Sequence, residues 1–395
     1  MTAPIYLDFN ATTPVDCRVA DAIHEAVRNL WGNPSSAHSY GAAAMLAIDK
    51  ARQQVAALIG AEPDEIVFTG GGSEASNHAI MGTCLGRPTG LLAKLFGRGM
   101  AHIVTGEIEH PATLAPIDYL KRLGASATVV GVDGFGRIDP AEVLSALKRP
   151  TRLVSIMHSN NEVGTLQPIR AIAEAARAHR ALMHTDAAQS LGKVPVNVNE
   201  LGVDLLTLAG HKLYAPKGIG ALFVRRGVKL ESLIHGADHE SGRRAGTENV
   251  PYIVGLGLAA EMARSTLAEQ MPRLQRLRDR LHLALRAGLG DRLTLNGHPT
   301  ERLPNTLNVN FPEFTGAALL AKLPGLAAST GAACHEKGKE GQSPVLCAMK
   351  VDPAVGIGAV RFSVGRTTTD DEIDRAAALI LKEFGQSPEH QPHRQ

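Results

Sequence analysis

The sequence predicts an α/β fold, in which a large domain with a mainly parallel seven-stranded sheet is followed by a smaller α+β C-terminal domain. Three observations predict this fold. A chain of 395 residues is too long for one small core, so two domains are expected. Between about residues 15 and 255, short apolar runs alternate with helical patterns, as in an α/β domain with helices on both faces of its sheet. After residue 255, a long charged helical stretch precedes short strand-like runs.

Seven apolar runs are the predicted strands of the large domain. Several are apolar at consecutive positions, which is typical of parallel strands that are covered on both faces. In chain order they are EIVF (65–68), HIVT (102–105), ATVVGV (127–132), RLVSIM (152–157), ALMHT (181–185), DLLTLA (204–209) and GALFV (220–224). The predicted helices of the same part of the chain cover residues 42–60, 111–124, 139–148 and 169–180.

The C-terminal part is predicted to begin with a helix over residues 261–289, in which Pro272 can introduce a bend. The final helix is expected to start at Thr369, with Glu372 completing a capping box. We therefore predict three parts, which are a large domain at 15–258, a small domain formed by 1–14 with 259–385, and a disordered tail at 386–395. Residues 86–100 look like a loop insertion between a helix and a strand.

Composition and charge exclude several classes of function. A net charge of +2 gives no electrostatic reason to expect direct nucleic-acid binding. No apolar run is long enough to span a membrane, and the N-terminus lacks the pattern of a signal peptide. The four cysteines (Cys17, Cys84, Cys334 and Cys347) form no CxxC pair, so neither a disulfide framework nor a metal site is favoured. The expected compartment is the cytoplasm. Cys347, in a helical pattern, is expected to be buried.

Polar residues follow three predicted strands at the edge where open parallel sheets bind ligands. The glycines of FTGGGSE (68–74) open a helix whose first turn favours a phosphate, although a plain tight turn is about as consistent with this motif. Asp186 could cap a turn or hold a pyridinium proton, and Lys212 could be solvated or form a Schiff base. Because the lysine and the aspartate each follow a strand, the joint cofactor interpretation is stronger than either part.

With these motifs identified, the chain resembles the cysteine desulfurase and selenocysteine lyase family. These enzymes are class-V aminotransferase-like, fold-type-I enzymes that depend on pyridoxal 5'-phosphate (PLP). The resemblance covers almost the whole chain and rests on ten motifs in family order. They are YLDFNATTPVD, WGNPSSAHSYG, IVFTGGGSEASN, HIVTGEIEHPA, SIMHSNNEVGT, HTDAAQSLGK, GHKLYAPKGIGALFVRRG, GRRAGTENVP, STGAACH and VRFSVGRTTT.

The resemblance implies a role for each matching residue. Lys212 would carry PLP, Asp186 would pair with the pyridinium nitrogen, His110 would lie over the ring and Cys334 would be the nucleophile. The other implied contacts are Gly72, Ser73 and His211 to the phosphate, Gln189 to the ring phenolate, Asn161 to ring and substrate, Arg361 to the substrate carboxylate, Thr247 to the phosphate of the other subunit, and Asn33 and Asn10 in the site lining. Ala209 departs from the serine that many desulfurases have before GHK.

The implied activity is the conversion of L-cysteine to L-alanine by a homodimer. The sulfur would remain on Cys334 as a persulfide and pass to an acceptor protein, for iron–sulfur cluster assembly or nucleic-acid thiolation. One alternative is a selenocysteine lyase that acts on L-selenocysteine, because GAACH followed by SPVL resembles the animal selenocysteine lyases. Two further alternatives are a non-catalytic sulfur-carrier scaffold, which the matching lysine, aspartate, histidine and cysteine argue against, and an ordinary aminotransferase, in which Cys334 would be dispensable.

Overall fold

The computed structural model describes residues 4–86, 101–330 and 341–385, and its largest element is a seven-stranded sheet. The strand order is β2-β8-β7-β6-β5-β3-β4. The strands are β2 (Ile66–Thr69), β3 (His102–Gly106), β4 (Ser126–Val130), β5 (Thr151–Ser155), β6 (Leu182–Asp186), β7 (Leu205–Ala209) and β8 (Gly220–Val224). All seven predicted strands are therefore confirmed, with ends that differ from the predicted ones by at most two residues.

The sheet is mainly parallel, as predicted. β8 pairs antiparallel with both β2 and β7, so β2 runs in the same direction as β7 and only β8 is reversed. The neighbouring pairs from β7 through β6, β5 and β3 to β4 are all parallel. The carboxyl ends of six strands therefore meet at one edge of the sheet, and the loops that leave this edge are positioned to form a site.

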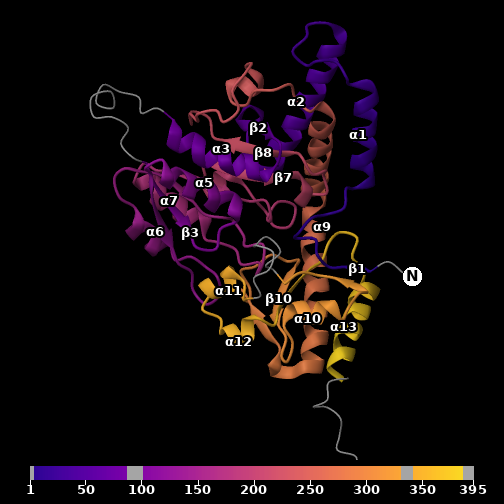
Figure 1. Ribbon diagram of the computed structural model, residues 1–395. Coiled ribbons are helices and arrows are strands. Elements are labelled where there is room, and N and C mark those ends of the chain that lie inside the picture. Colours follow the sequence, from indigo (N-terminus) through magenta and orange to yellow (C-terminus); the bar gives the residue numbers. More distant parts are fainter. Residues whose placement is uncertain (1–3, 87–100, 331–340, 386–395) are drawn as a thin grey trace, which may run out of the picture.

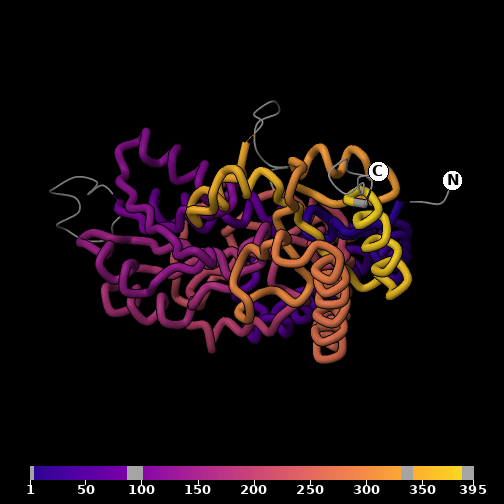
Figure 2. The backbone as a smooth tube through the Cα atoms, turned by 90° about the horizontal axis from the view of Figure 1, so that it is seen from below, coloured from indigo at the N-terminus to yellow at the C-terminus, as the bar shows by residue number. Residues whose placement is uncertain are grey.

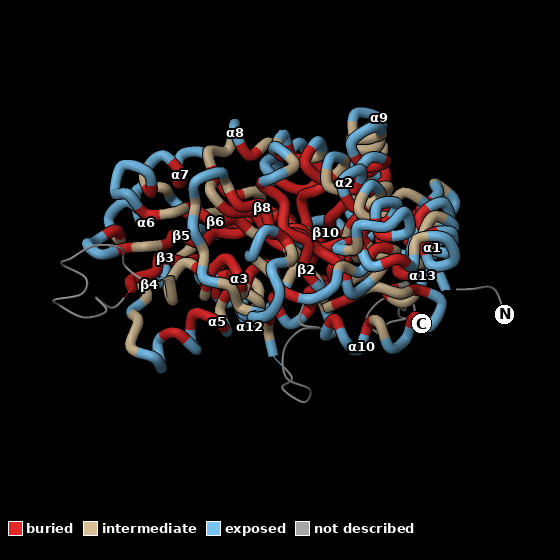
Figure 3. Tube along the Cα trace, turned by 90° about the horizontal axis from the view of Figure 1, so that it is seen from above, coloured by how far each residue is buried: buried red, intermediate tan, exposed pale blue. Residues whose placement is uncertain are grey.

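Helices cover both faces of this sheet because consecutive strand residues point to opposite sides. On β2, Val67 packs with α3 (Gly72–Leu85) and α5 (Pro111–Arg122), whereas Ile66 and Phe68 belong to the larger core on the opposite face. That larger core contains residues of α2 (Ser39–Ile59), α7 (Ile169–Ala178) and the first half of α9. Buried residues accordingly follow the strands through the interior, and exposed ones follow the outer helices (Figure 3).

The helix α9 (Val250–Leu289) is 40 residues long and extends from the seven-stranded sheet to the C-terminal part of the molecule (Figure 1). The predicted start at residue 261 is wrong, because the helix already begins after Asn249, whose side chain accepts a hydrogen bond from the Tyr252 N–H. Gly255 and Gly257 lower helix propensity in this stretch. They are tolerated because a Cβ at Gly255 would meet Ile23 at 2.6 Å, and one at Gly257 would meet Ala51 at 2.6 Å.

A second core surrounds a three-stranded antiparallel sheet of order β12-β10-β9. These strands are β9 (Thr294–Asn296), β10 (Thr306–Asn310) and β12 (Ala359–Ser363). The second half of α9, α10 (Gly316–Ala321) and α13 (Asp370–Gly385) contribute to this core. As predicted, Thr369 and Glu372 form the capping box of the last helix, with N–H···O distances of 2.9 and 3.2 Å.

Both ends of the described chain pack in this second core. β1 (Ile5–Tyr6) pairs in parallel with β11 (Leu326–Ala327), and Ile5 joins the same apolar cluster as the last helix. In Figure 2 the start of the described chain and the last helix accordingly lie on the same side of the molecule. The predicted boundary at 258/259 falls inside α9, and the division into two domains stays a prediction.

The remaining helices and 3₁₀ turns are α1 (Cys17–Asn29), α6 (Pro140–Ala146), α8 (Val198–Leu201), α11 (Pro344–Ala348), α12 (Pro353–Gly356), η1 (Pro63–Glu65), η2 (Gly210–Lys212), η3 (His239–Gly242) and η4 (Gly290–Arg292). Of the helices in the described ranges, none has the length and apolarity needed to cross a membrane.

A buried ion pair ties α2 to the segment that precedes α9. Glu240 accepts two hydrogen bonds from the Arg52 guanidinium at 2.8 Å and one from the Phe68 N–H at 3.0 Å, and its side chain is only 2% exposed. We expect Glu240→Ala to lower the free energy of unfolding by about 3 kcal/mol, because it leaves the Arg52 charge buried and unpaired. The exposed pair of Arg170 and Glu174 is the control, and Glu174→Ala should cost about 0.5 kcal/mol or less. Thermal unfolding that shows equal losses for both variants would contradict this expectation.

Candidate active site

A cavity of about 650 Å³ opens at the carboxyl edge of the large sheet. This volume lies within the usual range of small-molecule sites, which is roughly 300–1,000 Å³. The cavity brings together residues at or after the ends of five strands of this sheet, residues of the N-terminal segment, and Arg361 from the C-terminal part of the chain. Those discussed below are Asn10, Ala11, Gly71, Gly72, Ser73, His110, Asn161, Asp186, Gln189, Ala209, His211, Lys212, Lys217 and Arg361. No group of metal-ligating side chains occurs in the part of the chain that the structure describes.

Lys212 is positioned by the turn that follows β7. The chain leaves the strand at Ala209 and passes through the 3₁₀ turn η2, which ends at this lysine. The Lys212 ammonium donates to the backbone carbonyls of Asn10 at 2.6 Å and Ala11 at 2.7 Å. The N-terminal segment therefore presents carbonyl oxygens to the lysine, and its amine is held inside the cavity.

Asp186 is the last residue of β6, the strand adjacent to β7, and its side chain is largely but not fully buried at the cavity wall. Burial raises the pKa of this carboxyl group, while the hydrogen bond from the Ala188 N–H at 2.9 Å and the nearby His110 and Lys212 side chains act in the opposite direction. Protein groups therefore compensate the carboxylate only in part. A protonated ring nitrogen beside Asp186 would complete that compensation.

His110 caps the N-terminus of α5, directly after the loop that leaves β3. Its Nδ1 accepts a hydrogen bond from the Ala112 N–H at 3.0 Å. Because Nδ1 is an acceptor, the neutral ring carries its proton on Nε2. Pro111 at the first helical position fixes the entry of the chain into the helix, so the imidazole is held by local backbone geometry at the cavity wall.

The first turn of α3 and the start of η2 form a cradle for an anion. Gly71 has φ +147°, a conformation that favours glycine, and a Cβ at Gly72 would lie 3.0 Å from Ala209 Cβ. The backbone can therefore come close to a ligand, and the N–H groups at the helix start have no helical acceptors. Ser73 lines the same wall. Burial, with the charge of Lys212, lowers the pKa of His211 to about 4, so this imidazole is neutral at pH 7.

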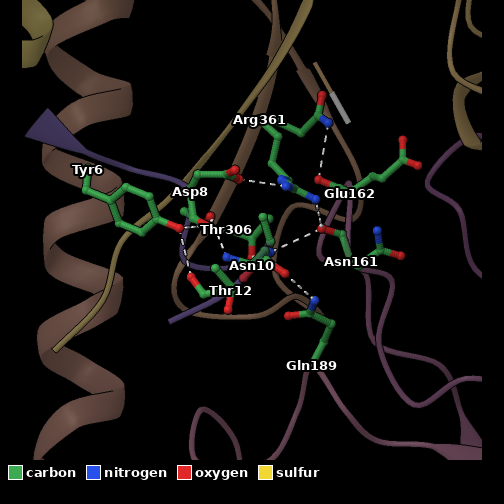
Figure 4. A network of polar contacts seen from close by, with 12 residues as sticks. Tyr6, Asp8, Asn10, Thr12, Asn161, Glu162, Gln189, Thr306 and Arg361 are labelled. Atoms are coloured by element: carbon green, nitrogen blue, oxygen red, sulfur yellow. Dashed lines mark hydrogen bonds and ion pairs between the residues drawn. The ribbon is translucent and has the colours of Figure 1, made fainter. Parts of the chain in front are cut away.

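Arg361 enters the cavity from β12 of the smaller sheet, with only 3% of its surface exposed. Its guanidinium donates to Asp8 Oδ1 at 2.8 Å and to the Asn161 carbonyl at 3.0 Å (Figure 4). Within the described residues, Arg361 Nε has no hydrogen-bond partner. The planar group is thus held on one side by protein and retains a donor for an anionic ligand.

Asn10 lines the cavity, but its side chain is already saturated by protein contacts. Its Nδ2 donates to Thr306 Oγ1 at 2.8 Å and to the Asn161 carbonyl at 3.2 Å (Figure 4). Its Oδ1 accepts from Asn305 at 3.0 Å and Lys193 at 3.2 Å. A direct contact of this amide with a substrate would break one of these bonds, so the geometry favours a positioning role for Asn10.

Two predicted site residues lie away from this cavity. Asn33 is exposed in the turn before α2, and its Oδ1 accepts from the Ser35 N–H at 2.9 Å. Thr247 is exposed in the segment that precedes α9. Cys334, the predicted nucleophile, lies outside the described residues. The expectation that Cys347 is buried is wrong, because in the five-residue helix α11 Val345 and Leu346 face the core while Cys347 is exposed.

The residues at the cavity fit pyridoxal phosphate on three counts. An amine on Lys212 can bond to the aldehyde, the partly compensated Asp186 can pair with a protonated ring nitrogen, and the glycine cradle with Ser73 can receive the phosphate. A lysine and an aspartate behind adjacent parallel strands, in a sheet of this order, define the class of fold-type-I PLP-dependent enzymes.

Comparisons with known proteins give the family within that class. A family model described as aminotransferase class-V matches residues 5–376. Cysteine desulfurase IscS of Dictyoglomus turgidum is 41% identical over 376 residues, which are 95% of this chain and 93% of the relative. A solved NifS-like protein has a TM-score of 0.87 at 35% identity, covering 97% of this chain and 99% of its own. A structure described as SspA in complex with cysteine has a TM-score of 0.76 at 34% identity, covering 91% and 98%. The chain belongs to the class-V aminotransferase family, whose cofactor is PLP.

Three charged residues near the cavity were not identified from the sequence. Lys217 lines the cavity and is exposed, which places a cation close to the glycine cradle where Ala209 offers no hydroxyl. Asp8 holds Arg361, and Lys193 contacts Gln189 and Asn10 from the interior. The PKG turn was a signal for Lys217. No local pattern distinguishes Asp8 or Lys193, because their contacts lie far away in the sequence.

Proposed function

We propose that this protein is a cysteine desulfurase, which releases L-alanine from L-cysteine and retains the sulfur on Cys334 as a persulfide. The observation that carries the proposal is the meeting of Lys212, Asp186 and Arg361 at one cavity. An amine, a buried carboxylate and a guanidinium fork are the groups that PLP chemistry on an α-amino acid requires. The relative from Dictyoglomus turgidum, named cysteine desulfurase IscS, supports the choice of substrate.

The proposed roles are those of the family residues that this chain matches, and the placement of most of them around one cavity supports them. When bound, PLP supplies an electron sink that acidifies the α-C–H bond of the amino acid. Arg361 binds the substrate carboxylate, Lys212 Nζ takes the α-proton, and Asp186 keeps a proton on the ring nitrogen. At the bound cofactor, His110 would cover the ring, Gln189 would donate to the ring oxygen, and Asn161 would lie near the ring and substrate, since all three line the cavity. The cradle of Gly72 and Ser73, with His211, receives the phosphate.

The sulfur transfer itself requires a thiolate on Cys334. This thiolate attacks the substrate sulfur, so that an S–S bond forms while the Cβ–S bond breaks. The electron pair of the broken bond goes to Cβ, which takes up a proton and gives alanine. The persulfide then passes to a sulfur-acceptor protein, in iron–sulfur cluster assembly or nucleic-acid thiolation. A reducing compartment, the cytoplasm, is part of the proposal, and it is supported by the free thiols of Cys17, Cys84 and Cys347.

The test is alanine release from L-cysteine by the PLP-loaded protein and by two cysteine variants. Wild type and Cys347→Ala should release alanine at the same rate and carry a persulfide, whereas Cys334→Ala should release none above background. Cys347 is a suitable control because it is exposed and does not line the cavity. The proposal fails if wild type yields no alanine from L-cysteine, or if Cys334→Ala is as active as wild type.

Selenocysteine lyase activity is the second candidate, favoured by the GAACH motif (331–335) and the following SPVL (343–346). Selenium leaves carbon more easily than sulfur, so the reaction would not require the cysteine. Alanine release from L-selenocysteine that persists in Cys334→Ala, together with no release from L-cysteine, would replace the first proposal by this one.

Arg361→Lys tests the proposed substrate contact. A lysine cannot donate to Asp8, to the Asn161 carbonyl and to a carboxylate in one plane, so a charge-assisted hydrogen bond worth about 1.5–3 kcal/mol is lost. We expect the KM for L-cysteine to rise about 10- to 100-fold with a much smaller change in kcat. Arg375→Lys, at an exposed pair with Asp371, is the control. A KM unchanged by Arg361→Lys would rule out the contact.

We also propose that the protein acts as a homodimer in which Thr247 reaches the phosphate of the partner. An exposed aromatic pair supports an interface, because Trp31 and Tyr40 are 67% and 55% exposed and stack at 4.7 Å between ring centroids. Sedimentation should give twice the mass of the chain for wild type and a smaller mass for a Trp31→Ser, Tyr40→Ser double variant. A wild-type protein that sediments as a single chain would overturn this proposal.

A further inference from the structure

Lys193 is a buried lysine that the proposed reaction does not use. It lies four residues after Gln189, past a left-handed turn at Gly192 with φ +72°, and only 6% of its surface is exposed. Its Nζ donates to Gln189 Oε1 at 2.8 Å and to Asn10 Oδ1 at 3.2 Å. Both acceptors are uncharged amides, and no ion pair involves Lys193 within the described ranges. Because a buried lysine normally needs a charged partner, its presence here requires an explanation.

The surroundings of Lys193 favour its neutral form. Burial lowers the pKa of this amine well below its usual range, and the charges of Lys212 and Arg361 lower it further. Tyr214 and Arg366 line the same small cavity behind Lys212. The contacts of the Lys193 amine are the two hydrogen bonds to Gln189 and Asn10, and no carboxylate is paired with it within the described ranges. These hydrogen bonds are therefore the means by which Lys193 can act on its neighbours.

These hydrogen bonds fix the orientation of the Gln189 carboxamide. Its Oε1 accepts from Lys193, and its Nε2 donates to the Asn10 carbonyl at 2.8 Å (Figure 4). A flipped amide would set Nε2 against the lysine donor and Oε1 against a carbonyl oxygen, so both bonds would be lost. The second Nε2–H is left for a ligand in the cavity that Gln189 lines.

We propose that Lys193 is a positioning residue, which orients Gln189 so that its carboxamide donates to the ring oxygen of the bound cofactor. The inference rests on the proposed function, in which Gln189 makes that contact. Asn10 strengthens the arrangement, because its carbonyl receives both Gln189 Nε2 and Lys212 Nζ, and Lys193 holds its side chain. Gln189, Lys193 and Lys212 thus all donate hydrogen bonds to the same residue, Asn10.

The arrangement has a spectroscopic consequence. A hydrogen bond to the ring oxygen stabilises the anionic form of that oxygen and disperses its negative charge. The oxygen then stabilises less strongly the proton on the neighbouring nitrogen, which joins Lys212 to the cofactor. Without that donor, the full negative charge of the ring oxygen holds the proton on this nitrogen more tightly. The pH at which the visible absorption band of the bound cofactor changes should therefore rise when Gln189 is not oriented.

The experiment is a pH titration of the visible band of PLP-loaded protein. Lys193→Met keeps the length of the side chain and removes its donors, and the midpoint should rise by about one pH unit, a tenfold change in the proton-dissociation constant. Lys193→Gln, which cannot span both acceptors, should show the same rise and serves if the methionine variant does not fold. Lys121→Met, an exposed lysine on α5, is the control and should keep the wild-type midpoint. A wild-type midpoint in soluble Lys193 variants, with or without a lowered melting temperature, would assign Lys193 a structural role only and overturn the inference.

A double-variant cycle separates orientation from a direct effect on Lys212. Gln189→Met alone should raise the midpoint as much as Lys193→Met, and combining the two should add little, because the lysine acts through the glutamine. Shifts that add fully would show that Lys193 acts on Lys212 without Gln189, and would overturn the inference. Failure of the proposed function is distinguishable, since it would appear as wild-type protein that binds no PLP or releases no alanine.

Discussion

Lys212→Ala is expected to reduce alanine release from L-cysteine by at least about 10⁴-fold, the scale on which removal of a covalent catalytic residue acts. The physical reason is that one amine both bonds to the cofactor and moves the α-proton. Lys212 can do both because the turn η2 and the carbonyls of Asn10 and Ala11 hold its Nζ inside the cavity. Steady-state alanine formation with PLP present gives the measurement.

A second readout of this variant is independent of turnover. Borohydride reduction followed by mass spectrometry should show cofactor fixed to the wild-type chain and none fixed to Lys212→Ala. Lys217→Ala is the matched control, because Lys217 lines the same cavity and should leave the fixation intact. Cofactor fixed to Lys212→Ala in wild-type yield would show that Lys193 or Lys217 is the attachment site, and the assignment of Lys212 would be wrong.

Asp186→Asn is expected to reduce alanine release by about 10²- to 10⁴-fold, the usual size of a lost proton-holding group. The amide preserves the shape of the buried side chain, but it carries no charge to hold a proton on the ring nitrogen. PLP binding should raise the melting temperature less in this variant than in the wild type. The reason is that the protonated ring nitrogen no longer finds a carboxylate whose charge the protein compensates only in part.

The apo form of Asp186→Asn should melt at or above the temperature of the apo wild type, since a buried charge has been removed. Asp204→Asn is the control, as Asp204 is a partly buried carboxylate before β7, at the opposite edge of the sheet. It should retain the full PLP-dependent rise in melting temperature. If PLP raised the melting temperature of Asp186→Asn as much as that of the wild type, this aspartate would not contact the cofactor.

The residues that follow strands were predictable from the sequence, and those held by distant contacts were not. Asp186 and Lys212 lie directly behind apolar runs, so the parallel sheet places both at one edge without further information. Lys193 lies in a Gly-containing turn that has the sequence of an exposed turn. Its burial depends on Asn10 and Gln189, and a separation of 183 residues from Asn10 leaves no local signal.

Two errors have local physical causes. The start of α9 was misplaced because Gly255 and Gly257 weaken the helical pattern, although the close approach of α1 and α2 is what requires glycine there. Cys347 was expected to be buried because SPVLCAMK is apolar on several faces. In a helix of five residues, only part of one turn can face the core, and the cysteine falls outside it.

The hydrogen bond from the Asn10 N–H to Ser363 Oγ, at 2.9 Å, joins residues that are 353 positions apart. The segment that receives Lys212 is synthesised before the seven-stranded sheet, whereas the strand β12 that holds this segment is synthesised after that sheet. During translation, the segment whose carbonyls accept hydrogen bonds from Lys212 therefore cannot be fixed in place until β12 has emerged. The seven-stranded sheet is fully synthesised much earlier. Stable capture of PLP should thus wait until β12 has emerged, so that chains truncated before β12 remain in the apo form.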